Sequence, residues 1–198
     1  MRYYTVFCVS ILFALLPFSL KAEGGGKSAE SDKNLVETPL TALEEATSNI
    51  LKELNENEIK QFSAINNSFG IIRSVEDVQG SISKAVESCS SAHPDLKAQI
   101  STGFESWKET LRPVMREARK KLDKMVLLQS FARPSDVRAY LKKFDQAVIY
   151  RNQKLNSVPI QKMDDCQKLE SSMKRTQDDL VKLLTETLAL DSDIKGKE

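Results

Sequence analysis

Histidine and cysteine, two residue types that often carry catalysis, are scarce in this chain, which has one histidine and three cysteines. His93 is the only histidine, which argues against a Ser–His–Asp triad and against a zinc site built from several imidazoles. Cys89 lies four positions before His93, so the two could be considered as a nucleophile and its base. His93-Pro94 is more typical of a helix-ending turn, however, and Cys89 has a clearer use in a disulfide. We therefore predict no catalytic, cofactor-binding or metal-ligating residue.

Paired carboxylates are the other feature that could do chemistry. Adjacent positions on a helix project about 100° apart and do not face each other, so each pair is expected on a solvated face or in a first helical turn. An enzyme with an unrecognised carboxylate site is therefore the least favoured hypothesis. The pairs are Glu44/Glu45, Glu76/Asp77, Asp164/Asp165 and Asp178/Asp179.

Two of the three cysteines are predicted to form a disulfide. Cys8 lies within the apolar N-terminal run and is expected to be removed with it, which leaves Cys89 and Cys166. An even number of cysteines in an exported chain favours a structural bridge, and neither cysteine belongs to a C-x-x-C motif. A bond between residues 77 positions apart stabilises the fold by roughly 4 kcal/mol through chain entropy.

The N-terminus has the parts of a cleavable secretory signal peptide, assigned to residues 1–22. Arg2 supplies a positive charge, an uncharged apolar run extends from Val6 to Leu20, and Ala22 suits the position before the cut. The run is shorter than the roughly 20 residues that a membrane-spanning helix needs. We expect an exported protein, periplasmic or extracellular with the bacterial periplasm preferred, and no transmembrane segment in the mature chain.

Charge is unevenly distributed along the mature chain. Residues 23–107 carry 14 acidic and 7 basic side chains, whereas residues 108–151 carry 12 basic and 5 acidic ones. The basic segment is either neutralised by packing against acidic helices or presents a patch to an anionic partner. The net charge near zero gives no reason to expect nucleic-acid binding. The candidate contact patch consists of Arg112, Arg116, Arg119, Lys120, Lys121 and Lys124.

Apolar residues recur every three or four positions, which predicts an all-α fold: an up-and-down bundle of about five helices over residues 38–190. A polar, flexible leader (23–37) precedes this single domain and a disordered tail (191–198) follows it. The first helix is expected to end around 66–70 and the second to begin near Ser74. The third is long and kinked or broken at Pro113.

The last helix, near residues 162–190, carries the clearest apolar stripe of the chain. Short links make neighbouring helices antiparallel, so Cys89 at the end of the second helix and Cys166 at the start of the fifth lie at the same pole. This placement agrees with the predicted disulfide. The stripe consists of Cys166, Leu169, Met173, Thr176, Leu180, Leu183, Thr187 and Leu190.

The leading functional hypothesis is a non-enzymatic interaction module that binds a protein or an anionic envelope component. Its contact surface would be the basic patch and the corner between the third and fourth helices, and self-association is possible. The alternative is a carrier that holds a small apolar ligand between its helices. The residues expected to line that cavity are Phe104, Trp107, Met125, Phe144 and Leu180.

Overall fold

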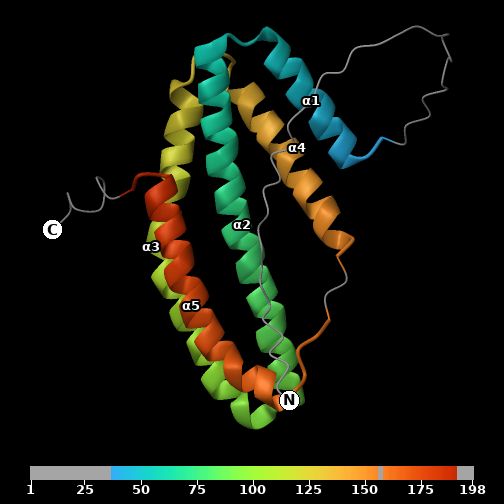
Figure 1. Cartoon of the computed structure of the whole chain (residues 1–198), viewed down its shortest axis with the longest axis vertical. Helices are drawn as coiled ribbons and strands as arrows, with labels where there is room; N and C mark the ends of the chain where they lie inside the picture. Colours follow the sequence, from blue (N-terminus) through green and yellow to red (C-terminus); the bar gives the residue numbers. More distant parts are fainter. Residues whose placement is uncertain (1–36, 156–157, 191–198) are drawn as a thin grey trace, which may run out of the picture. The chain divides into compact units, whose positions relative to one another are not determined.

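The computed structural model describes residues 37–155 and 158–190, and within these ranges the chain is all-α (Figure 1). The predicted signal peptide (1–22), the leader apart from Glu37 and the predicted tail (191–198) lie outside the described residues. The described part contains five α-helices and a short 3₁₀ turn, which confirms the predicted up-and-down helical bundle. The helices are α1 (Pro39–Glu53), α2 (Glu56–Ala92), α3 (Lys97–Leu128), α4 (Pro134–Gln153) and α5 (Met163–Thr187), with η1 at Pro94–Leu96.

The break between the first two helices lies at Leu54-Asn55, so the predicted boundary at 66–74 is wrong. Asn55 caps α2 by accepting hydrogen bonds from the amides of Asn57 and Glu58, and the Glu58 carboxylate accepts the Asn55 amide in return. The polar stretch that suggested a helix end is helical throughout. Contacts with α4 stabilise the helix at this level: a Cβ added to Gly70 would lie 3.7 Å from the ring of Phe144.

Helix α3 remains helical through Pro113, as expected of a long third helix that contains a proline. Pro113 lies on the exposed face of α3, while Leu111 and Met115 on either side of it are buried. The carbonyl of Glu109, which would otherwise accept the missing amide, can therefore be hydrated. A proline on the solvent side interrupts one hydrogen bond without disturbing the buried face.

Helices α2 and α3 form a long antiparallel pair that the other helices cover in two separate parts (Figure 1). Contacts between α3 and α5 keep a near-constant offset, from Gln99–Glu170 to Lys121–Ala189, so α5 runs parallel to α3. Helix α5 also packs on α2. Its cover extends from the disulfide pole to about Lys121.

Helix α4 covers the first half of α2 rather than the second. Phe69 of α2 meets Phe144 of α4 edge-on with ring centroids 5.4 Å apart, and the Asn152 amide donates to Asp77. Helix α1 packs mainly on α4, where Thr47 lies within hydrogen-bond distance (3.0 Å) of the Tyr140 hydroxyl. The α2–α3 pair therefore carries α5 on one half and α4 with α1 on the other.

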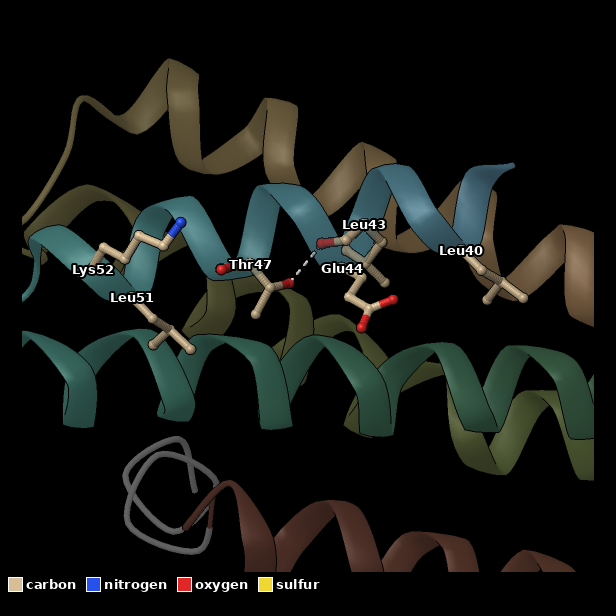
Figure 2. A pocket seen from close by; sticks show the side chains of 7 residues that line it. Leu40, Leu43, Glu44, Thr47, Leu51 and Lys52 are labelled. Carbon is tan, nitrogen blue, oxygen red and sulfur yellow. Dashed lines mark hydrogen bonds between the residues drawn. The ribbon is translucent and has the colours of Figure 1, made fainter. Parts of the chain in front are cut away.

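Helix α1 has no buried residue, unlike the other four α-helices. Leu40 and Leu51 project from the same side of α1 and are 45% and 40% exposed (Figure 2). Leu43 and Ile50 are only partly covered by the core. α1 is therefore held by one shallow face and a small number of polar contacts.

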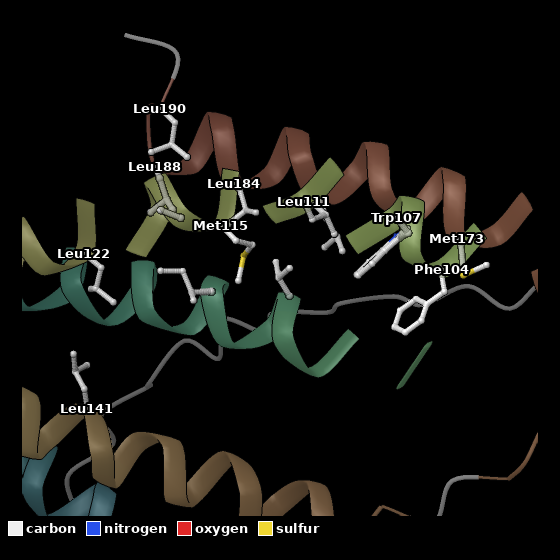
Figure 3. Packing of buried hydrophobic residues seen from close by; sticks show 14 of the residues in the cluster. Phe104, Trp107, Leu111, Met115, Leu122, Leu141, Met173, Leu184, Leu188 and Leu190 are labelled. Carbon is white, nitrogen blue, oxygen red and sulfur yellow. The ribbon is translucent and has the colours of Figure 1, made fainter. Parts of the chain in front are cut away.

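The core between α3 and α5 is filled by large side chains (Figure 3). Trp107 is 1% exposed and stacks on Phe104 with ring centroids 6.0 Å apart. Met173 of α5 packs beside Gly103 of α3, where an added Cβ would lie 3.4 Å from the methionine methyl carbon.

The end of α5 differs from the predicted stripe. Leu184 and Leu188 are buried, whereas Leu183 is 41% exposed and Thr187 is also exposed. A strict heptad pattern drifts relative to 3.6 residues per turn, so the buried positions continue in steps of four after Leu180.

Among the described residues, no helix is long and apolar enough to cross a membrane.

Helix α5 ends in a turn that requires a left-handed residue. Ala189 has φ 45°, and the amide of Leu190 donates to the carbonyl of Thr185, as in a Schellman motif. The turn buries Leu188 and Leu190, which are 3% and 0% exposed. Because alanine carries a Cβ that disfavours this conformation, Ala189→Gly should raise the free energy of unfolding by about 0.5–1 kcal/mol. Urea denaturation followed by circular dichroism measures this, and Ala92→Gly, at an ordinary helical position, should instead destabilise.

Candidate functional site

The two described cysteines form a disulfide at the pole where α2 ends and α5 begins, as predicted. The Cα atoms of Cys89 and Cys166 are 5.6 Å apart, and both side chains are fully buried. Nε2 of His93 lies 2.8 Å from the carbonyl of Gln161, and the Ser88 hydroxyl donates to the carbonyl of Ile160. His93 therefore fastens the segment that precedes α5 and has no free thiol beside it.

Three of the six residues of the candidate contact patch are paired with carboxylates of their own helix. Arg112 bonds Glu109 at 2.6 Å, while Lys120 and Arg116 lie 2.9 and 3.7 Å from Glu117. These pairs are largely exposed, so each stabilises the fold by less than about 1 kcal/mol. The structure spreads the six cations along several faces of α3 instead of gathering them into one site.

Arg119 differs because its partner lies on another helix. Its guanidinium donates to Glu76 of α2 at 2.8 Å, and Glu76 also receives Arg73 at 2.6 Å. Arg73 is 18% exposed and contacts Asp77 at 3.2 Å and Asp145 of α4 at 2.8 Å. This ion-pair network joins α2, α3 and α4 at mid-length.

The predicted carboxylate pairs are thus not all isolated on solvated faces. Glu76 and Asp77 both bind Arg73, which shows that adjacent positions can share one cation when that cation lies between them. Asp164 and Asp165 lie in the first turn of α5, where the helix dipole favours negative charge. Among the described residues, no group of three or more histidine, cysteine or acidic side chains is arranged to hold a metal ion.

Acidification should weaken the ion-pair network. The pKa of Glu76 lies below its ordinary value of 4.5: partial burial acts to raise it, but hydrogen bonds from Arg119 and Arg73 together with their charges outweigh burial. A carboxyl with a lowered folded pKa stabilises the fold above its unfolded pKa and loses that contribution as the pH falls through the folded value. We expect the free energy of unfolding to fall below pH 4.5, and Glu76→Gln to flatten this dependence. If the free energy of unfolding falls equally steeply with pH in the wild type and in Glu76→Gln, the prediction is wrong. Glu87→Gln, which makes the same change at an exposed site, is the control variant.

A groove between α2 and α3 lies beyond the end of α5. We call it the lysine groove. Its apolar lining residues, which we call its floor, are Ala64 and Ile65 of α2 with Met125 and Leu128 of α3, and its volume is about 370 Å³. The remaining lining residues are Gln61, Lys121, Lys124 and Gln129.

Apolar exposure is concentrated at this end of α3. Leu127 and Leu128 are 57% and 72% exposed, although both lie in the last turn of a helix whose opposite face is buried. Two adjacent exposed leucines beside a groove with an apolar floor form a surface that typically makes protein contacts.

The polar groups around the lysine groove are unequally engaged. Gln61 accepts the amide of Ser130, and Gln129 accepts the amide of Phe131, so both glutamines hold the α3–α4 turn. Lys121 donates to the carbonyl of Ala189 at 3.2 Å. Lys124 has no hydrogen-bond or ion-pair partner among the described residues. Of the predicted patch, Lys121 and Lys124 are therefore the members that adjoin an apolar surface.

The side chains predicted to line a ligand cavity do not line any one of the three pockets described here together. Phe104, Trp107 and Leu180 belong to the packed core, Phe144 packs on Phe69, and Met125 lies in the floor of the lysine groove. Two further pockets are described: a shallow one on α1 (Figure 2) and one between α3 and α5. Neither is lined by any of these five residues.

Sequence reasoning identified two of the groove's eight lining residues as site candidates, Lys121 and Lys124, and a third, Met125, only as a possible cavity residue. It missed Leu128 as a contact residue, because a leucine at a helical apolar spacing is usually buried. The lining residues of the groove come from α2 and from the end of α3, next to the corner between the third and fourth helices. That corner stays a predicted contact region.

Comparison of the chain with protein-family models, with curated proteins and with solved structures gives no match.

Proposed function

We propose that this protein is an exported, non-enzymatic interaction module that binds another protein through the lysine groove. The observation that supports the proposal is the combination, at one end of α3, of an apolar groove, two exposed leucines and Lys124, which has no partner within residues 37–155 and 158–190. A partner of matching chemistry presents apolar side chains flanked by carboxylates.

The export part of the proposal is supported by the composition of residues 1–22 and by the disulfide. A buried bridge between Cys89 and Cys166 suits an oxidising compartment, such as the periplasm or the extracellular space. A binding role is favoured over catalysis because the described histidine and cysteines are engaged in holding α5 to α2.

The proposal is tested by capturing partners from the exported fraction of the source cells with immobilised protein that lacks residues 1–22. Lys124→Glu and Leu128→Ser should each reduce recovery of a specific protein at least about tenfold, since each removes complementarity at the groove. Arg112→Glu makes the same charge change on the same helix but at a site outside the groove, so it should leave recovery unchanged. Equal recovery by all variants would overturn the proposal.

A second arm separates a protein partner from an anionic envelope component. Vesicles that contain phosphatidylglycerol are sedimented with the same set of variants, whose folding is verified by circular dichroism. If the protein binds these vesicles through Lys124 and captures no protein in the same way, the partner is a lipid surface and the proposal of a protein partner is wrong.

A further inference from the structure

Helix α1 carries apolar side chains on two neighbouring faces, and the bundle covers only one of them. Ala46 and Ile50 are partly buried against the core, and α1 packs mainly on α4. On the neighbouring face Leu40 and Leu51 are 45% and 40% exposed (Figure 2). A helix at the surface of a bundle needs one apolar face toward the core, so the second face has no use within the described part of the chain.

The exposed face of α1 bears one acidic and one basic residue. It forms a shallow pocket of about 590 Å³ that is lined by residues of α1 alone, Glu44 and Lys52 among them (Figure 2). Neither charge has an ion-pair partner within residues 37–155 and 158–190. The two residues are eight positions apart, which is about 12 Å along the helix axis and too far for a pair within α1.

This arrangement of charges is complementary to itself. When two copies of α1 lie antiparallel about a two-fold axis, Glu44 of each copy lies on the same side of the axis as the partner's Lys52. Leu40 then lies toward the end that carries the partner's Leu51. A parallel pair would instead bring like charges together, which is unfavourable. Ser48 lies midway between Glu44 and Lys52, and its small side chain leaves room for the second helix.

We infer that a second copy of this chain covers the exposed face of α1, through antiparallel, two-fold pairing of the two α1 helices. Since α1 has 15 residues and is about 22 Å long, the contact is at the small end of protein interfaces and the association is weak. The face shares no lining residue with the lysine groove, so the inference goes beyond the proposed function. The dimer presents two lysine grooves, and where the proposed function holds, a partner with two matching segments binds it more tightly than the monomer.

Sedimentation velocity of the protein without residues 1–22 tests whether the dimer forms. The average mass should rise from that of the monomer toward that of the dimer between roughly 10 µM and 1 mM, the range expected of a small contact between helices. A monomer at every concentration in this range would overturn the inference.

Charge reversal tests whether the dimer uses this face of α1. Glu44→Lys and Lys52→Glu each bring like charges together twice in a two-fold pair, so each should raise the Kd of the dimer at least about tenfold. The double variant Glu44→Lys, Lys52→Glu restores opposite charges across the axis and should dimerise like the wild type. A double variant as weak as the single ones would show that the antiparallel pairing is wrong.

Glu53→Lys is the matched control for these reversals. Glu53 is exposed and lies nine positions after Glu44, which places it on the opposite side of α1 at about 100° per residue. The variant makes the same charge change on the same helix and should leave the Kd of the dimer unchanged. A tenfold loss with Glu53→Lys would mean that net charge, and not the face, controls the association.

Hydrogen exchange provides a second measurement that requires no substitution. The amides of α1 should exchange more slowly at about 1 mM protein than at about 10 µM, because the partner holds the helix in place. The amides of α5, which packs on the other half of the α2–α3 pair, should exchange equally at both concentrations. Exchange of α1 that does not depend on concentration would mean that any dimer contact lies elsewhere.

The two proposals can fail separately. Lys124→Glu should reduce capture of the partner protein and leave the dimer intact. If Lys124→Glu prevents dimerisation, the copies meet at the lysine groove and the inference about α1 is wrong. If the dimer forms through α1 and capture does not change with Lys124→Glu, only the proposed function is overturned.

Discussion

Removing the disulfide should lower the free energy of unfolding by about 4 kcal/mol, because the bond between Cys89 and Cys166 closes a loop across 77 positions. A domain of this size is expected to have only about 5–15 kcal/mol in total, so the double replacement Cys89→Ala, Cys166→Ala should leave it marginally stable. Urea denaturation of both proteins, followed by circular dichroism, measures the difference.

The reduced wild-type protein is the matched control. It lacks the bond but keeps both sulfur atoms in the core, so its difference from the double variant isolates the packing contribution of two fully buried side chains. Because the sulfurs are inaccessible in the folded state, reduction should require partial unfolding and be slow without denaturant. Oxidised and reduced proteins of equal stability would contradict the expected role of the bond.

Truncation of Trp107 should cost a comparable amount, about 3–5 kcal/mol. Trp107 is 1% exposed and stacks on Phe104 at the centre of the contact between α3 and α5. Trp107→Ala leaves a cavity that helices on either side can only partly fill. The free energy of unfolding from urea denaturation gives the value.

Trp107→Phe separates the loss of volume from the loss of a polar group. The indole Nε1 of Trp107 is buried and has no hydrogen-bond partner in the described part of the chain, and an unpaired buried donor costs about 1–3 kcal/mol. Phenylalanine removes this penalty and keeps most of the apolar contact, so its net cost should stay below about 1.5 kcal/mol. A cost equal to that of Trp107→Ala would show that the indole nitrogen is satisfied in solution.

The sequence was sufficient to predict the fold class and the pairing of the cysteines. Both follow from local patterns: apolar residues at helical spacing identify the helices, and short links alternate their direction. The position of the break after α1 was missed because Asn66, Asn67 and Gly70 favour a turn in isolation. In the folded chain the amide of Asn66 donates to Tyr140 and Phe144 packs beside Gly70, so contacts with α4 decide the outcome.

The candidate site was less predictable than the fold. The pairing of Arg112 with Glu109 and of Lys120 with Glu117 follows from a spacing of three positions, which can be read from the sequence. The contact of Arg119 with Glu76 joins two helices and cannot. The lysine groove depends on where α5 stops relative to α3, a property of the whole packing that no single stretch of sequence encodes.

Because α1 packs on the other helices through one shallow face, it is expected to unfold locally more often than they do. α1 has no buried side chain, and among the described helices its one side-chain hydrogen bond to another helix joins Thr47 to Tyr140 of α4. Its amides should exchange hydrogen with solvent at a far lower opening free energy than those of α2 or α3, near the rate of a fraying end. A protease that cuts between Glu53 and Glu56 would then act on the native population. The disulfide pole, at the opposite end of α2, should exchange only on global unfolding.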